Sequence, residues 1–88
     1  MRSIDIMKLS YALLQKLKMQ YNPDSIIEIR YRGLDLAFRT DHEGNPITLF
    51  LGRKLNTGKI KGRRYVRTIK KDAAGTLLKD HWDFKGNT

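Results

Sequence analysis

The sequence contains no cysteine, only two prolines and no long apolar run. The absence of cysteine excludes a disulfide framework, a thiolate zinc site and a cysteine nucleophile. With 40% apolar residues, the composition is typical of a globular domain rather than a disordered or fibrous chain. No segment approaches the roughly 20 apolar residues of a membrane-spanning helix, and no signal-peptide pattern is present. We therefore expect one cytoplasmic domain over residues 1–88 that has no membrane role.

One stretch also lacks acidic residues. From Arg53 to Lys71 there are nine basic residues and no Asp or Glu, whereas the rest of the chain carries nine basic and nine acidic residues. The whole net charge of +9 therefore belongs to this stretch. A basic bias confined to one segment is typical of proteins that contact phosphates.

The N-terminal segment has the periodicity of an amphipathic helix. We predict a helix over about residues 4–21, with Ser3 as its N-cap and Asn22-Pro23 as its end. Its apolar side chains cover about half of the helix circumference at ~100° per residue. An arc this broad is explained either by deep burial in the domain's own core or by contact with a second subunit.

From Ser25 the period of apolar residues changes from 3.6 to 2, which predicts β-strands. Arg32-Gly33 fits a tight turn between the first two strands, because glycine readily adopts a positive φ. The predicted strands cover about residues 25–32, 34–40, 46–52, 62–71 and 76–84. The fold class predicted is α+β: an N-terminal helix packed on a curved five-stranded antiparallel meander. Partial closure of this sheet into a barrel remains an open alternative.

The last two predicted strands form a hairpin around a loop at residues 72–75. A register with Lys71 opposite Thr76 places oppositely charged and aromatic residues directly across from each other, and each such pair contributes about 0.2–1 kcal/mol. The predicted pairs are Ile69 with Leu78, Arg67 with Asp80, Tyr65 with Trp82, Arg63 with Phe84, Val66 with His81, and Arg64 with Asp83.

The predicted Asp partners account for Arg64 and Arg67, which leaves seven basic residues unexplained. Five of the seven lie between Arg53 and Arg63, among three glycines, and this spacing predicts a mobile basic loop over residues 53–61. An aromatic side chain near the loop could stack on a base, and the candidates are Phe50, Tyr65 and Trp82. The candidate nucleic-acid-binding residues are Arg53, Lys54, Lys59, Lys61, Arg63, Lys70, Lys71 and Tyr65.

The predicted function is a small, non-enzymatic binding module that contacts nucleic-acid phosphates through residues 53–63. RNA is placed ahead of DNA because no predicted helix carries the charge needed in a major groove. The alternative is a protein-interaction or assembly module that uses its broad apolar helix face or a sheet edge. Its partner would be another protein or, in a homodimer, a second copy of this chain. Neither reading requires a metal, a cofactor or a small-molecule substrate.

Two resemblances accompany this interpretation. In outline, a basic chain with a helix and an antiparallel sheet resembles the ribosome-dependent RNA-cleaving toxins, and that resemblance implies Arg63, Tyr65 and Arg67 as catalytic candidates. Such toxins generally have a pair of helices before the sheet, and this chain has one. The segments GKIKGRRYVR and KDHWDFKG, within residues 58–86, resemble short uncharacterised bacterial proteins. The second resemblance implies a family but no activity.

Overall fold

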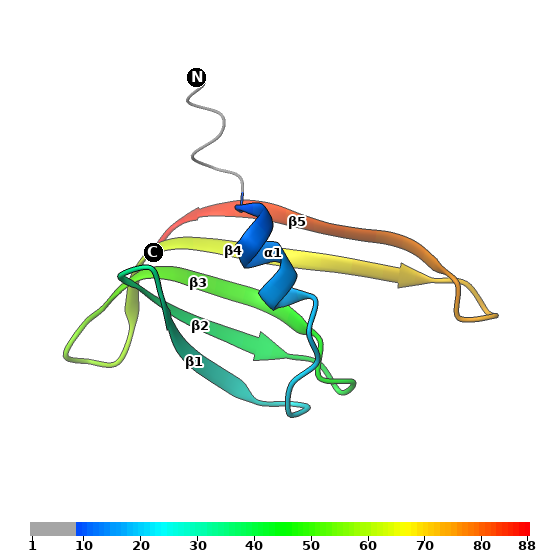
Figure 1. Cartoon of the computed structure of the whole chain (residues 1–88), viewed down its shortest axis with the longest axis horizontal. Coiled ribbons are helices and arrows are strands. Elements are labelled where there is room, and N and C mark those ends of the chain that lie inside the picture. Colours follow the sequence, from blue (N-terminus) through cyan, green and yellow to red (C-terminus); the bar gives the residue numbers. More distant parts are fainter. Residues whose placement is uncertain (1–8) are drawn as a thin grey trace, which may run out of the picture.

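The computed structural model describes residues 9–88, which form a short helix in front of an antiparallel sheet (Figure 1). The strands follow one another in the order β1-β2-β3-β4-β5, so the predicted meander is confirmed. The two outer strands, β1 and β5, do not pair with each other, and closure into a barrel is therefore wrong. The elements are α1 (Tyr11–Leu17), β1 (Ile26–Tyr31), β2 (Leu34–Thr40), β3 (Pro46–Lys54), β4 (Ile60–Lys71) and β5 (Leu77–Asn87).

Alternation along the strands sorts the side chains onto two faces of the sheet. The helix face packs against α1 and carries the predicted inward set, as the pairs Ile29 with Leu36 and Phe38 with Leu49 illustrate. The opposite face, here called the outer face, carries Phe50 between its neighbours on β2 and β4. The buried hydrophobic cluster between α1 and the sheet consists of Leu13, Leu17, Leu36, Phe38, Leu49, Leu51 and Tyr65.

The helix is much shorter than the predicted span of residues 4–21. Of that span, residues 4–8 and the proposed cap Ser3 lie outside the described residues, and the N-cap is Ser10, whose hydroxyl oxygen accepts from the N–H of Leu13 at 3.2 Å. At the other end the chain leaves the helix after Leu17 because Tyr21 is held elsewhere: its N–H donates to the carbonyl oxygen of Gly44 at 2.9 Å. Capping and tertiary contacts thus override the helical periodicity.

The predicted register of β4 and β5 is wrong by two residues over most of its length. Tyr65 lies opposite Phe84 and Arg67 lies opposite Trp82, because the ladder shifts between Lys70 and Lys71 next to the turn. A shift of two keeps every side chain on its predicted face. Arg67 therefore still meets Asp80, as a diagonal neighbour rather than a directly opposite one.

The other predicted ion pair, Arg64 with Asp83, is not formed in the described part of the chain, because Asp83 contacts His81 instead. Asp83 lies opposite Val66, and its Oδ1 is 2.5 Å from Nε2 of His81. Within residues 9–88 there is no ion pair between Arg64 and Asp83, so that prediction is wrong. The presence of Arg64 on β4 is therefore no longer explained by an ion pair with Asp83.

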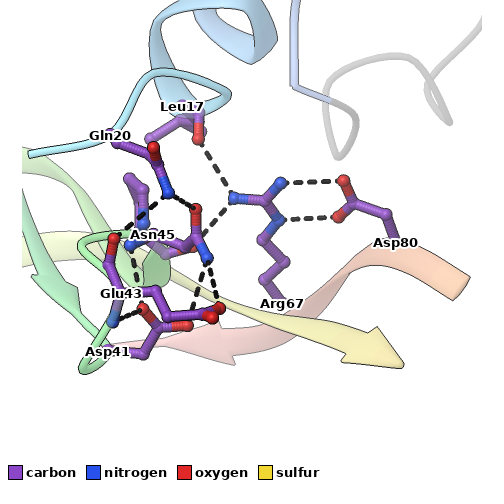
Figure 2. A network of polar contacts seen from close by, with 8 residues as sticks. Leu17, Gln20, Asp41, Glu43, Asn45, Arg67 and Asp80 are labelled. Carbon is purple, nitrogen blue, oxygen red and sulfur yellow. Dashed lines mark hydrogen bonds and ion pairs between the residues drawn. The ribbon is translucent and has the colours of Figure 1, made fainter. Parts of the chain in front are cut away.

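Arg67 ties the helix to the sheet (Figure 2). Its side chain is only 7% exposed, and its Nε and Nη2 donate to the two carboxylate oxygens of Asp80 at 2.6 and 2.7 Å. Its Nη1 donates to the carbonyl oxygens of Leu17 and Pro46, both at 3.1 Å. The last carbonyl groups of a helix have no partner within it, so Arg67 also caps the C-terminal end of α1.

The joined ends of β3 and β4 bend across the outer face of the sheet. The N–H of Lys54 donates to Asp35 Oδ2 at 2.8 Å, and Lys54 Nζ lies 2.8 Å from Oε1 of Glu28, on β1 two strands away. At the base of the bend Gly52 lies opposite Gly62. A Cβ atom on either glycine would be 2.9 Å from the Cα of the other and would clash with a carbonyl oxygen of the facing strand. Two facing glycines therefore permit the bend.

We expect Gly62→Ala to destabilise the protein by about 1–3 kcal/mol, because the added methyl group overpacks a site bounded by backbone atoms. Urea unfolding followed by circular dichroism measures the change in the free energy of unfolding. Lys61→Ala is the matched control, since it alters an exposed side chain one residue away. Equal stability of the two variants would contradict the close approach of the strands.

Candidate functional site

The predicted mobile loop is an ordered β-hairpin. Residues 53–63, here called the basic hairpin, comprise the end of β3, a turn at residues 55–59 and the start of β4. Inside the turn, the N–H of Leu55 donates to the carbonyl oxygen of Lys59 at 2.7 Å, and the N–H of Gly58 donates to that of Leu55 at 2.9 Å. The loop predicted over residues 53–61 is therefore too long, because Arg53 and Lys54 continue β3 and Ile60 already begins β4.

The basic hairpin sets two cations directly against each other. Arg53 and Lys61 are cross-strand partners, and neither forms a salt bridge within residues 9–88. Like charges in this position destabilise a sheet. Both side chains line a groove of about 560 Å³ that also contains the turn at Gly33 and the ion pair of Arg30 with Asp35, whose Nη1 and Oδ1 are 3.4 Å apart. An anion in this groove would relieve the repulsion between Arg53 and Lys61.

The other cations of the basic hairpin have different surroundings. Lys59 is exposed in the turn. Lys54 is bound to Glu28, and the hydrogen bond and charge of that carboxylate raise the pKa of Lys54 above its usual value. Arg63 continues the strand on the same face as Lys61 and is partly buried. Arg53, Lys59 and Lys61 are thus the cations best placed to meet a ligand.

Lys70 and Lys71 do not join this site. They lie at the other end of β4 (Figure 1), about 30 Å from Lys61 for nine residues of extended strand. Lys70 lies opposite Lys79, and Lys71 Nζ is 3.6 Å from Oε1 of Glu43. Lys70 and Lys71 are therefore remote from the basic hairpin, and their contribution to phosphate binding stays a prediction.

Tyr65 cannot stack on a base in this structure. Its side chain is 1% exposed and belongs to the cluster under α1, with its ring centroid 5.5 Å from that of Phe84. The interior position follows from alternation, which puts Tyr65 on the helix face. Because Arg67 is also buried in its ion pair with Asp80, the toxin resemblance loses two of its three catalytic candidates.

The outer face holds a second group of residues: Phe50, which the sequence indicated as an aromatic side chain near the loop, and two cations that sequence reasoning missed. Phe50 is partly exposed there, directly opposite Arg64 on β4 and Ala37 on β2. Arg39 follows two residues after Ala37 and therefore lies on the same face. Alternation in ITLFL was a usable signal for Phe50, since it is out of phase with the buried Leu49 and Leu51. No such signal existed for Arg64, because the assumed register paired it with Asp83.

No protein-family model matches this chain, no curated protein is significantly similar to it, and no solved structure matches it. Among residues 9–88, no group of three or more His, Asp or Glu side chains is arranged to hold a metal ion. No helix in this part of the chain has the length and apolarity needed to cross a membrane. The charge and shape of the basic hairpin are therefore the features of the described chain that bear on function.

Proposed function

We propose that the protein binds the phosphate backbone of nucleic acid through the basic hairpin, with RNA ahead of DNA. The observation that carries the proposal is the opposition of Arg53 and Lys61 across two paired strands without a carboxylate partner in the described chain. A phosphate between them offsets the repulsion and releases counterions from the nucleic acid. Lys59, in the adjacent turn, extends the same positive surface.

The preference for RNA over duplex DNA rests on the shape of the cationic element. Direct reading of duplex DNA in the major groove uses a helix or a β-ribbon that fits its width of about 12 Å. The only helix in residues 9–88 has seven residues, and the basic hairpin is no free ribbon, because Lys54 ties it to Asp35 and Glu28 of its own sheet. A bent hairpin beside open grooves instead suits a flexible single strand or an irregular RNA, whose phosphates can adjust to fixed cations.

The test is fluorescence-anisotropy titration of a labelled single-stranded RNA, repeated across a salt series. We expect the wild-type protein to bind at low salt, with log affinity falling linearly against log salt. Replacing Arg53, Lys59 and Lys61 together with Gln removes three phosphate contacts. At about 0.7 per contact on a single strand, the salt slope should become shallower by about 2, and low-salt affinity should fall about tenfold or more.

A matched control removes the same amount of charge at the other end of the sheet. The triple replacement of Lys16, Lys70 and Lys79 with Gln alters exposed side chains outside the basic hairpin. It should leave the salt slope within about 0.5 of the wild-type value. Equal losses in both triple variants would mean that binding follows net charge alone. Absence of binding by the wild-type protein at low salt would contradict the proposed function itself.

A protein partner is the second candidate function, and one specific observation favours it. The β4–β5 hairpin projects beyond the rest of the sheet (Figure 1), and it exposes Leu77 and Leu78 by 53% and 65%. The adjoining strand β5 is a sheet edge whose free backbone groups can pair with another strand. The salt series separates the two functions, because an apolar contact at these leucines does not weaken as salt is added.

A further inference from the structure

The bend of the basic hairpin creates an apolar groove on the outer face. The groove has a volume of about 400 Å³, and its base is formed by Ala37 and Phe50. Ile26 of β1 borders one side and is 66% exposed, while Ile60 of the basic hairpin borders the other. The helix α1 packs on the opposite face, so this groove is separate from the buried core.

One cation lines the groove, together with Glu28 and Thr88, and two further cations neighbour Phe50 in the sheet. Lys59 lines its rim, Arg64 lies directly opposite Phe50 on β4, and Arg39 is a diagonal neighbour of Phe50 on β2. No salt bridge within residues 9–88 involves any of these three cations. The acidic residue at the rim, Glu28, is neutralised by Lys54 at 2.8 Å. The partly exposed ring of Phe50 therefore has Arg64 and Arg39 as neighbours in the sheet and Lys59 at the rim of its groove.

We infer that this groove receives an unpaired base of a single-stranded nucleic acid, with Phe50 as the stacking platform. The inference rests on the proposed function and extends it from phosphates to a base. An aromatic face accepts any base, whereas the flanking cations hold the adjacent phosphates. Pockets of roughly 300–1,000 Å³ hold drug-sized ligands, so a groove of this size has room for one base.

Charge complementarity distinguishes a base from the other candidate occupant, an apolar side chain of a protein. An apolar anchor would gain contact with Phe50 and Ile26 but would leave Arg39, Lys59 and Arg64 without partners around it. A nucleotide combines a flat apolar ring with a phosphate within one residue, so a single ligand satisfies the ring and the cations together. The juxtaposition of Phe50 with these cations therefore favours nucleic acid.

The test compares two labelled ten-residue RNA strands, oligouridylate and a strand with the same phosphates but abasic sugars. Both are titrated with the wild-type protein and with Phe50→Ala at low salt. We expect the wild-type protein to bind oligouridylate at least about fivefold more tightly than the abasic strand, which is the lower end of the stacking contribution of one base. Phe50→Ala should remove that preference and leave binding of the abasic strand within about twofold of wild type.

A second variant guards against an effect of Phe50→Ala on folding. Phe50→Trp keeps an aromatic platform, should retain the preference for oligouridylate, and should show quenching of indole fluorescence that the abasic strand does not produce. Quenching in Phe50→Trp beyond that of the wild-type protein, whose only tryptophan is Trp82, reports a base at position 50.

The outcomes separate this inference from the proposed function. Equal binding of both strands by the wild-type protein would contradict the binding of a base in the groove and leave phosphate binding intact. A preference for oligouridylate that survives in Phe50→Ala would also overturn the groove, because the base would then stack elsewhere. Binding of neither strand would overturn the proposed function, and the inference with it.

Discussion

Arg67→Ala should destabilise the protein by about 3–5 kcal/mol, a large part of the roughly 4–13 kcal/mol expected for a domain of this length. The substitution leaves the carboxylate of Asp80 without its bidentate partner and removes two donors from the carbonyl oxygens of Leu17 and Pro46. Thermal unfolding followed by circular dichroism should show a decrease in Tm of at least about 12 °C.

Arg64→Ala is the matched control, since it removes the same side chain three positions away on the same strand. Arg64 lies on the outer face and has no salt bridge within residues 9–88, so its loss should change stability by about 0.5 kcal/mol or less. Similar destabilisation by both variants would show that loss of arginine packing on β4, rather than the ion pair with Asp80, causes the effect.

The dependence on pH identifies the ion pair as the cause. The hydrogen bond and charge of Arg67 hold the pKa of Asp80 below its usual value of 3.8, although burial opposes this shift. A lowered folded-state pKa stabilises the protein above the unfolded pKa, and this stabilisation is lost as pH falls through the folded value. The free energy of unfolding should therefore fall below about pH 4 more steeply in the wild-type protein than in Arg67→Ala.

The sequence predicts the faces of the strands better than their pairing. A period of two decides which side chains face α1, and Leu36, Phe38, Leu49 and Leu51 are buried as expected. The pairing of two strands depends on where their register shifts, and here it shifts between Lys70 and Lys71, next to Leu77. These residue types also occur in hairpins without a register shift, so the sequence carries no local signal for it. The even shift made both predicted ion pairs diagonal neighbours, and Arg67 still binds Asp80 whereas Asp83 contacts His81.

The candidate site was predictable in charge but not in shape. The run without acidic residues located the basic hairpin, since charge is read directly from composition. Its order and its bend depend on contacts between distant residues: Lys54 with Glu28, and Gly52 with Gly62. Glycines within a basic segment are equally compatible with a flexible loop and with closely approaching strands. The bend that forms the groove at Phe50 therefore has no local signal.

Phe38→Ala should cost about 3–5 kcal/mol, whereas Phe50→Ala should cost about 1 kcal/mol. Phe38 is 1% exposed, and its ring lies 4.9 Å from that of Tyr21 in an edge-to-face contact. Phe38 is the cross-strand partner of Leu49, so the next residue, Phe50, points to the outer face. Guanidinium unfolding, followed by fluorescence of the partly buried Trp82, compares the two variants in one assay.

The losses of stability in Phe38→Ala and Phe50→Ala together show whether the ring of Phe50 serves folding or binding. A ring packed as tightly as Phe38 has no free face, and its removal would leave a cavity surrounded by atoms that cannot close in. A ring at the base of an open groove leaves no such closed cavity, because solvent can enter the vacated space. Equal costs would therefore contradict the open groove and the base-stacking role together. A low cost for Phe50→Ala combined with loss of the preference for oligouridylate would mean that this aromatic side chain contributes to binding rather than to folding.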